Sequence, residues 1–110
     1  MRVYLIRKDK GIDAKGEYDF ETKKLTVFKG SRVSQDIART KTFRGTRSIE
    51  KTRQGTVKNC IVQKNVDFTS SSTAANFVTG TSTNGLQAWR DEQGHTLQTI
   101  LNDQKEKEKK

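Results

Sequence analysis

The sequence of 110 residues contains no proline, one cysteine and one histidine. The single cysteine, Cys60, excludes an internal disulfide, and with His95 it supplies too few ligands for the usual zinc sites. The same scarcity leaves no credible Cys/His or Ser/His/Asp catalytic arrangement. No glycine-rich phosphate loop is followed by a lysine. We therefore expect a protein that is not catalytic on its own and that binds neither a metal nor another cofactor.

Long apolar runs are also lacking. No run approaches the roughly 20 residues that a membrane-spanning helix needs, and the apolar stretch near the start is too short for a signal peptide. We therefore expect a cytoplasmic protein with no membrane partner. Hydrophobic residues make up only 30% of the chain, which predicts a thin core. The length suits one domain, which we place at 1–102, followed by a charged, disordered tail at 103–110.

Positive charge is abundant and unevenly placed. The net charge is +9; residues 1–66 hold 17 Lys or Arg and 7 Asp or Glu, whereas residues 67–110 hold 5 and 6. The basic side chains of the segment 39–64 are Arg39, Lys41, Arg44, Arg47, Lys51, Arg53, Lys58 and Lys64. Such a segment attracts polyanions, which favours nucleic acid as the partner. The other interpretation is a surface that only keeps the protein soluble.

Short β-branched and aromatic runs predict strands at 3–6, 12–18, 25–28 and 57–62. Thr46 is placed to cap a helix at 47–54, with Gly55 as its stop. Gly16 interrupts its strand pattern, which indicates a bulge or a close backbone contact. We predict a small α+β domain with a mainly antiparallel sheet of about five short strands and two or three short helices.

The densest set of local signals begins at Phe68. Ser70 is placed to cap a helix whose apolar stripe is formed by Ala74, Phe77 and Val78, and Gly80 supplies a left-handed stop. Downstream, Asn84-Gly85 is a strong turn dipeptide, and Leu86 and Trp89 are expected to be buried anchors. The last short helix is expected after Thr96, with Leu97, Ile100 and Leu101 on one side.

Several of these residues have a second interpretation. The hydroxyl and N–H groups at Ser70–Ser72 suit a phosphate as well as helix capping, which we favour. Trp89 suits base stacking as well as core packing, which we again favour. Asn84 suits an adenine edge as well as a turn. Cys60 is expected to be a small buried hydrophobe in its strand.

A family pattern runs through the chain. It consists of FTSSSTAA at 68–75, then Gly80, Asn84-Gly85, Trp89, Gly94, Thr96 and Leu97, and upstream of AKG at 14–16 with Tyr18 and VFKGS at 27–31. Over roughly residues 12–101 the chain resembles a domain of unknown function that occurs at the C-terminus of GIY-YIG nucleases and of restriction-modification proteins. It is also similar to the related restriction-enzyme and adenine-methylase associated (RAMA) domain.

The chain departs from that family pattern at two positions. Ser71 stands where proline is usual, which is tolerable because the first helical N–H lacks an intrahelical partner. Leu86 stands where an aromatic residue is common, so one stacking surface is lost. The resemblance implies a setting in restriction, modification or mobile-element biology, with a separately encoded nuclease or methylase as a further partner.

One fragment is similar to a nuclease metal site: Asp9 or Asp13, followed by Glu21 and Lys23. Two carboxylates would hold Mg²⁺ and the lysine would lie beside the attacking water. Glu21 and Lys23 fall in a polar hairpin loop rather than on a central strand, so we interpret this as a chance match.

We therefore predict an accessory module that binds nucleic acid, double-stranded DNA rather than RNA. The residues expected to contact it are Arg39, Lys41, Arg44, Arg47, Lys51, Arg53 and Lys58, with Ser70, Ser72 and Asn84 close by. The alternative is a protein-interaction module that docks its partner on a surface formed by Leu86 and Trp89, with basic charge only for solubility.

Overall fold

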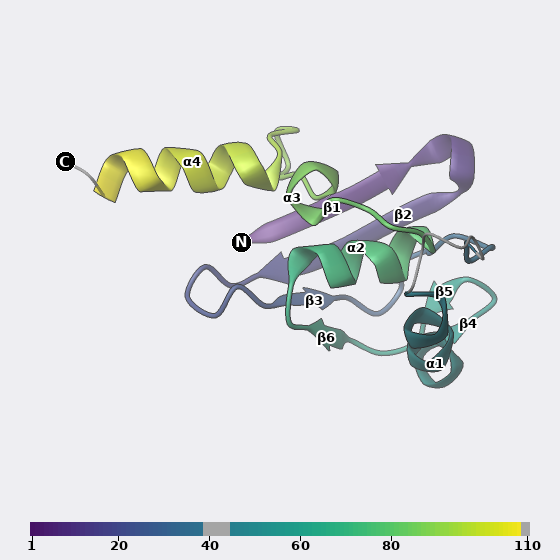
Figure 1. Cartoon of the computed structure of the whole chain (residues 1–110). Helices are drawn as coiled ribbons and strands as arrows, with labels where there is room; N and C mark the ends of the chain where they lie inside the picture. Colours follow the sequence, from purple (N-terminus) through teal and green to yellow (C-terminus); the bar gives the residue numbers. More distant parts are fainter. Residues whose placement is uncertain (39–44, 109–110) are drawn as a thin grey trace.

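A computed structural model describes residues 1–38 and 45–108 and confirms the predicted α+β class. A four-stranded antiparallel sheet and a two-stranded hairpin are combined with short helices (Figure 1). The elements are β1 (Arg2–Arg7), η1 (Lys8–Lys10, a 3-10 turn), β2 (Ile12–Tyr18), β3 (Leu25–Val27), α1 (Thr46–Thr56), β4 (Val57–Lys58), β5 (Ile61–Val62), β6 (Val66–Phe68), α2 (Ser71–Thr79), α3 (Gly85–Ala88) and α4 (Leu97–Glu108).

The main sheet has the strand order β1-β2-β3-β6, with every neighbouring pair antiparallel. Strand β2 alternates strictly between buried and exposed residues, as a strand with one face in the core should. Gly16 lies on its buried face, where a Cβ atom would collide with the backbone oxygen of Thr26. The close contact that its position predicted is therefore confirmed.

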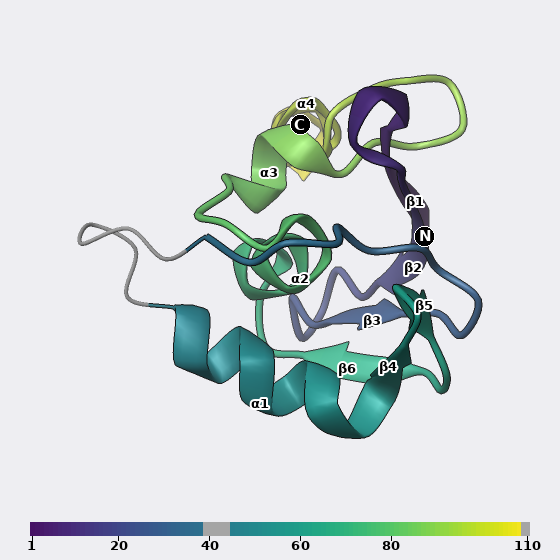
Figure 2. The ribbon, with the colours of Figure 1, turned by 90° about the vertical axis from the view of Figure 1, so that its right-hand side faces the viewer.

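Helix α2 covers one face of this sheet, and its stripe of Ala74, Phe77 and Val78 is fully buried there as predicted. Gly80 ends the helix in the left-handed conformation at φ 75°, also as predicted. None of the described helices lies over the opposite side of the sheet, as the turned view shows (Figure 2). We call that side the open face; its side chains on β1 and β2 include Tyr4, Ile6, Asp13 and Lys15.

The strand predicted at 57–62 is wrong, because this segment is a tight hairpin. β4 and β5 pair with each other, Val57 with Val62 and Lys58 with Ile61. Asn59 and Cys60 form the two-residue turn, both with positive φ (52° and 66°), as a turn matching the twist of the strands requires. Cys60 is consequently half-buried at a corner rather than a core residue on a strand.

The predicted ends of α1 are also wrong. Thr46 lies inside the helix and its hydroxyl donates to the Ala38 carbonyl, while Gly45 occupies the cap without a side-chain bond. Gly55 is helical, and α1 continues to Thr56. Val57 caps the helix, its N–H donates to Arg53 O, and β4 begins at this residue. Packing of the helix therefore outweighs the local preference of glycine.

The boundary expected after Asn102 does not coincide with a break in secondary structure. The helix that starts at Leu97 continues to Glu108, through most of the segment predicted to be a disordered tail. Leu97 is fully buried at the start of the helix, and Asn102 to Lys105 are exposed. Only the first turns of α4 therefore belong to the packed core.

Candidate nucleic-acid interface

The basic segment 39–64 divides into parts with different placements. Arg39, Lys41 and Arg44 lie outside the described residues. Arg47 and Lys51, four residues apart on α1, are exposed on the side of the helix opposite the buried Ile49. Lys58 is exposed on β4 immediately after the helix, and Lys64 is exposed beyond β5. The side chains of these described residues are therefore accessible to a partner.

Arg53 is the exception, and its predicted place on a DNA-binding surface is wrong. It lies four residues after Ile49 on the inward side of α1 and is only 9% exposed. Its Nη1 donates to Ser34 O at 2.8 Å, and its Nη2 to Phe77 O at 2.6 Å and to Ser34 Oγ at 3.0 Å. Burial lowers the pKa of the Arg53 guanidinium. Arg53 therefore joins α1 to the end of α2.

Ser70, Ser72 and Asn84 lie in one region of the fold, and their oxygens bond to the protein. Ser70 Oγ accepts from the N–H of Thr73 at 3.1 Å, which confirms it as the cap of α2. Ser72 Oγ accepts from Gly85 N–H at 3.1 Å, and Asn84 Oδ1 accepts from Leu86 N–H at 3.0 Å. Helix capping, the interpretation we favoured for the serines, accounts for the bonds of Ser70.

The turn predicted at Asn84-Gly85 is wrong, because neither residue has a positive φ. Asn84 has φ −76° and caps α3, and Gly85 is the first residue of that helix. A Cβ atom at Gly85 would collide with the backbone of Ser71 and Ser72. Glycine is therefore required here for a close approach of two helices rather than for a positive φ.

The fold separates this cluster from the basic hairpin by the length of α2 (Figure 1). Ser70 stands at the beginning of α2. The other end of the helix is bound to Arg53 and to Ser34, whose N–H donates to Val78 O at 2.8 Å. Val33, next in the chain to Ser34, donates to Cys60 O of the hairpin at 2.8 Å. The predicted set of contact residues is therefore not one continuous surface.

On the open face, a row of side chains runs from the hairpin across the sheet. Lys58 pairs with Ile61, Ile61 with Arg32, Arg32 with Asp13, and Asp13 with Ile6. Residues paired across strands project to the same side, so Lys58 and Arg32 share one face although they are far apart in the chain. Arg32 is the residue that connects the hairpin to β2.

A second row lies beside the first. Tyr4 pairs with Lys15, and Phe28 N–H donates to Lys15 O at 2.9 Å, which places the three residues side by side across β1, β2 and the end of β3. The guanidinium of Arg2 lies 5.3 Å from the centre of the Phe28 ring. The open face thus combines aromatic rings with basic groups.

A hollow of about 470 Å³ lies where these rows meet. Three of its lining residues are basic (Lys15, Lys29 and Arg32), and Asp13 is the acid among them. In the described part of the chain, none of the three basic side chains forms an ion pair. Asp13, which pairs with Arg32 across the strands, offsets part of their charge, and an anion can take the place of the solvent ions that balance the rest.

Sequence reasoning missed Lys15, Lys29 and Arg32. The alternation of β2 contained the signal for Lys15, since it puts Asp13, Lys15 and Glu17 on the side away from the core. Arg32 had no comparable signal, because its segment forms only isolated bridges to Asp13 and Ile61 instead of a regular strand.

The surface proposed for a protein partner, Leu86 with Trp89, is not available as such. Trp89 is fully buried, and its Nε1–H donates to Ser71 O at 3.0 Å. Leu86 is half-buried against the core. Trp89 is therefore a packing residue, as we favoured, and it cannot stack on a base or receive a partner without unfolding this region.

No group of three or more His, Cys, Asp or Glu side chains in the described ranges could hold a metal ion. Glu21 and Lys23 lie in the turn between β2 and β3, where Lys23 has φ 62° and Asp19 Oδ1 accepts from Glu21 N–H at 2.9 Å. These residues shape the turn. Among the described helices, none has the length and apolar character to cross a membrane.

Comparison with known families identifies a match over most of the chain. A family described as a domain of unknown function (DUF4357) matches residues 5–101, which covers most of the chain and all strands except the start of β1. No curated protein and no solved structure gives a match.

Proposed function

The chain belongs to this family of domains of unknown function, and we propose that it is a non-catalytic accessory module that binds double-stranded DNA. The observation that supports the proposal most is the gathering of Lys15, Arg32 and Lys58 on the open face without ion pairs to other described residues. The resemblance to domains of GIY-YIG nucleases and restriction-modification proteins favours a restriction, modification or mobile-element setting. We include a separately encoded nuclease or methylase among its partners.

The chemistry of the proposed contact is electrostatic. Neighbouring strands are about 5 Å apart, so Lys58 and Arg32, separated by Ile61, lie about 10 Å apart. Each DNA strand carries one phosphate per roughly 3.4 Å of helix axis, so a row of this width meets several phosphates. Contacts to phosphates fix position and register but carry no sequence information. Arg47 and Lys51 are exposed on α1, outside the open face, and we propose them as a second basic patch of the same interface.

The proposal predicts a strong dependence of DNA affinity on salt. Neutralising six phosphates would give log K against log salt a slope of about −5. In the triple variant Lys15→Gln, Arg32→Gln, Lys58→Gln the slope should weaken by about 3, because each removed contact releases about one counterion fewer. Fluorescence anisotropy with a short duplex at several salt concentrations measures both.

A control variant removes the same charge elsewhere: Lys23→Gln, Lys24→Gln, Lys105→Gln, all exposed in the β2–β3 turn or on α4. Its slope should stay close to that of the unmodified protein. A flat salt response of the unmodified protein, or an equal loss in the control, would contradict the proposal. A further pair, Arg47→Gln with Lys51→Gln, tests whether α1 belongs to the same interface.

A further inference from the structure

The outer edge of β1 is only partly occupied. Tyr4 N–H donates to Arg90 O at 2.7 Å, and Arg90 N–H donates to Tyr4 O at 2.9 Å. The backbone of Tyr4 therefore points away from β2, and by the alternation of an antiparallel pair so does the backbone of Ile6. Arg90 thus shows that this edge accepts an antiparallel chain.

Ile6 is the position on this edge that remains open. Its backbone N–H and C=O have no hydrogen-bond partner in the described segments, and its side chain is 52% exposed. It is the large hydrophobic residue that the described chain leaves exposed. An unpaired strand edge beside an exposed apolar side chain is a template for another strand.

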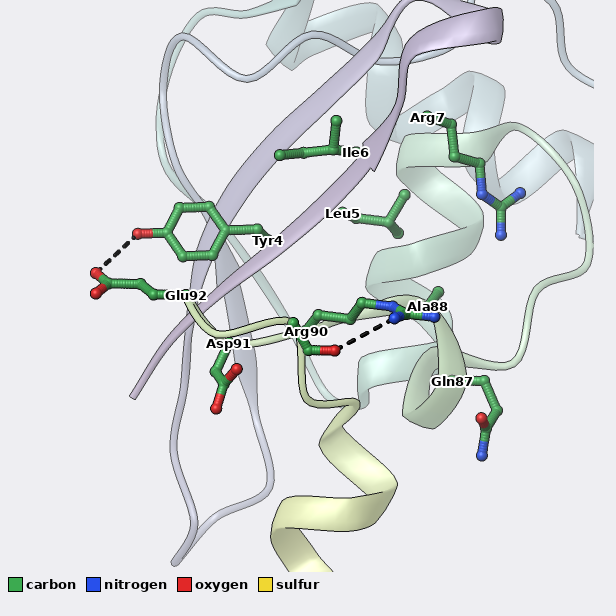
Figure 3. Close-up of a pocket in the computed structure, with 10 residues that line it drawn as sticks. Tyr4, Leu5, Ile6, Arg7, Gln87, Ala88, Arg90, Asp91 and Glu92 are labelled. Atoms are coloured by element: carbon green, nitrogen blue, oxygen red, sulfur yellow. Dashed lines mark hydrogen bonds between the residues drawn. The ribbon is translucent and has the colours of Figure 1, made fainter.

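A groove of about 670 Å³ runs along this edge, and we call it the β1 groove (Figure 3). Tyr4 and Ile6 border one side of it, Gln87 and Ala88 of α3 border the other, and the turn at 91–94 lies at one end. Its lining residues are Tyr4, Leu5, Ile6, Arg7, Gln87, Ala88, Arg90, Asp91, Glu92 and Gly94.

The acids of the β1 groove are engaged within the protein. Glu92 Oε1 accepts from the Tyr4 hydroxyl at 3.1 Å, and Asp91 Oδ1 accepts from the N–H groups of Gln93 and His95 at 3.0 and 2.9 Å. Burial alone would raise the pKa of Asp91, but hydrogen bonds from His95 and Gln93 outweigh it and hold that pKa below its usual value. Neither carboxylate therefore needs a ligand.

The cations of the β1 groove are much less engaged. Arg90 Nη1 donates to Gly94 O at 3.2 Å, which leaves its other donors available. The Arg7 side chain is half-buried and has no ion pair or hydrogen bond within the described ranges. The donors that the groove leaves unused are those of Arg7 and Arg90, so a carboxylate of the occupant can accept hydrogen bonds from them.

We propose that the β1 groove binds an extended acidic peptide segment of a partner protein. The segment would add to the edge of β1, exchange backbone hydrogen bonds with Ile6, and place carboxylates on Arg7 and Arg90. A peptide fits better than a nucleic acid because Ile6 offers a backbone N–H and a backbone C=O side by side. A residue of a second strand can pair with both groups at once. This inference is separate from DNA binding.

The test uses the ¹⁵N-labelled full chain and a blocked peptide of alternating valine and glutamate. NMR titration should shift the Ile6 amide and slow its hydrogen exchange. The same peptide N-methylated at alternate amides should fail to bind, since it cannot pair with a strand. Arg7→Gln should weaken binding about tenfold, whereas Lys10→Gln, which removes the same charge outside the groove, should leave it unchanged.

Any one of three results would overturn the inference. The first is that the peptide does not bind at millimolar concentration. The others are that the N-methylated peptide, or a peptide of alternating valine and lysine, binds equally well. Displacement of the peptide by a DNA duplex that shifts the same amides would assign the groove to nucleic acid. Concentration-dependent dimerisation that protects Ile6 without peptide would assign it to a second copy of the chain. DNA affinity measured in parallel separates failure of this inference from failure of the proposed function.

Discussion

Around α2 and α3, hydroxyl, amide and guanidinium groups bond to the protein itself, whereas on the open face lysine and arginine side chains extend into solvent. Ser70 and Asn84 cap helices, and Arg53 binds the carbonyls at the end of α2. Lys15 and Arg32 have no such internal partner in the described structure. Substitutions in the first region should change stability, and substitutions in the second should change binding.

The largest expected effect comes from a methyl group at Gly85. In Gly85→Ala the added carbon meets the backbone of Ser71, which cannot move without displacing α2, so we expect a loss of about 3 kcal/mol or more in the free energy of unfolding. Gly55→Ala is the control, because no atom lies near a Cβ there and the residue is helical. It should stabilise the protein by about 1 kcal/mol. Urea unfolding measures both, and a tolerated Gly85→Ala would contradict the described contact of the two helices.

A smaller loss should follow from removing the buried guanidinium. Arg53→Met leaves the carbonyls of Ser34 and Phe77 without their donor, which should cost about 2–3 kcal/mol. Lys51→Met, on the exposed side of the same helix, should change stability by less than about 0.5 kcal/mol and weaken DNA binding instead. Thermal unfolding and anisotropy, measured on both variants, separate the two roles. Equal stability of the two variants would show that Arg53 is not the internal connection that its bonds indicate.

The smallest effect tests the serines. Ser70→Ala removes the cap of α2 and should cost about 1 kcal/mol of unfolding free energy, with DNA affinity unchanged once the protein is folded. Lys58→Gln should weaken DNA binding and leave the free energy of unfolding unchanged. A loss of affinity in Ser70→Ala without a loss of stability would return this helix start to the binding surface.

The fold was predictable where local chemistry and packing agree. The alternation of β2, the serine cap at Ser70 and the stop at Gly80 each determine their element from within a few residues. The strand predicted at 57–62 was wrong because Asn59-Cys60 is not a recognised turn dipeptide as Asn-Gly is, yet both residues adopt positive φ. The helix stop predicted at Gly55 was wrong for the opposite reason, since packing of the helix keeps this glycine helical.

The candidate site was less predictable because long-range pairing creates it. Basic density along the chain pointed to Arg47, Lys51 and Lys58, which are exposed, and equally to Arg53, whose inward position follows from helical phase. Nor could it add Arg32, which reaches the open face through bridges to residues 19 positions before and 29 positions after it. Charge counts indicate a class of partner, whereas register decides which charges meet it.

The bridge between Tyr4 and Arg90 has a consequence for how the protein is made. A strand near the start of the chain receives its outer neighbour from a residue synthesised 86 positions later. During translation the edge of β1 stays uncovered until Arg90 has left the ribosome, and contacts of such large sequence separation form slowly. The nascent chain therefore passes through a stage in which both Tyr4 and Ile6 are open to pairing with other strands.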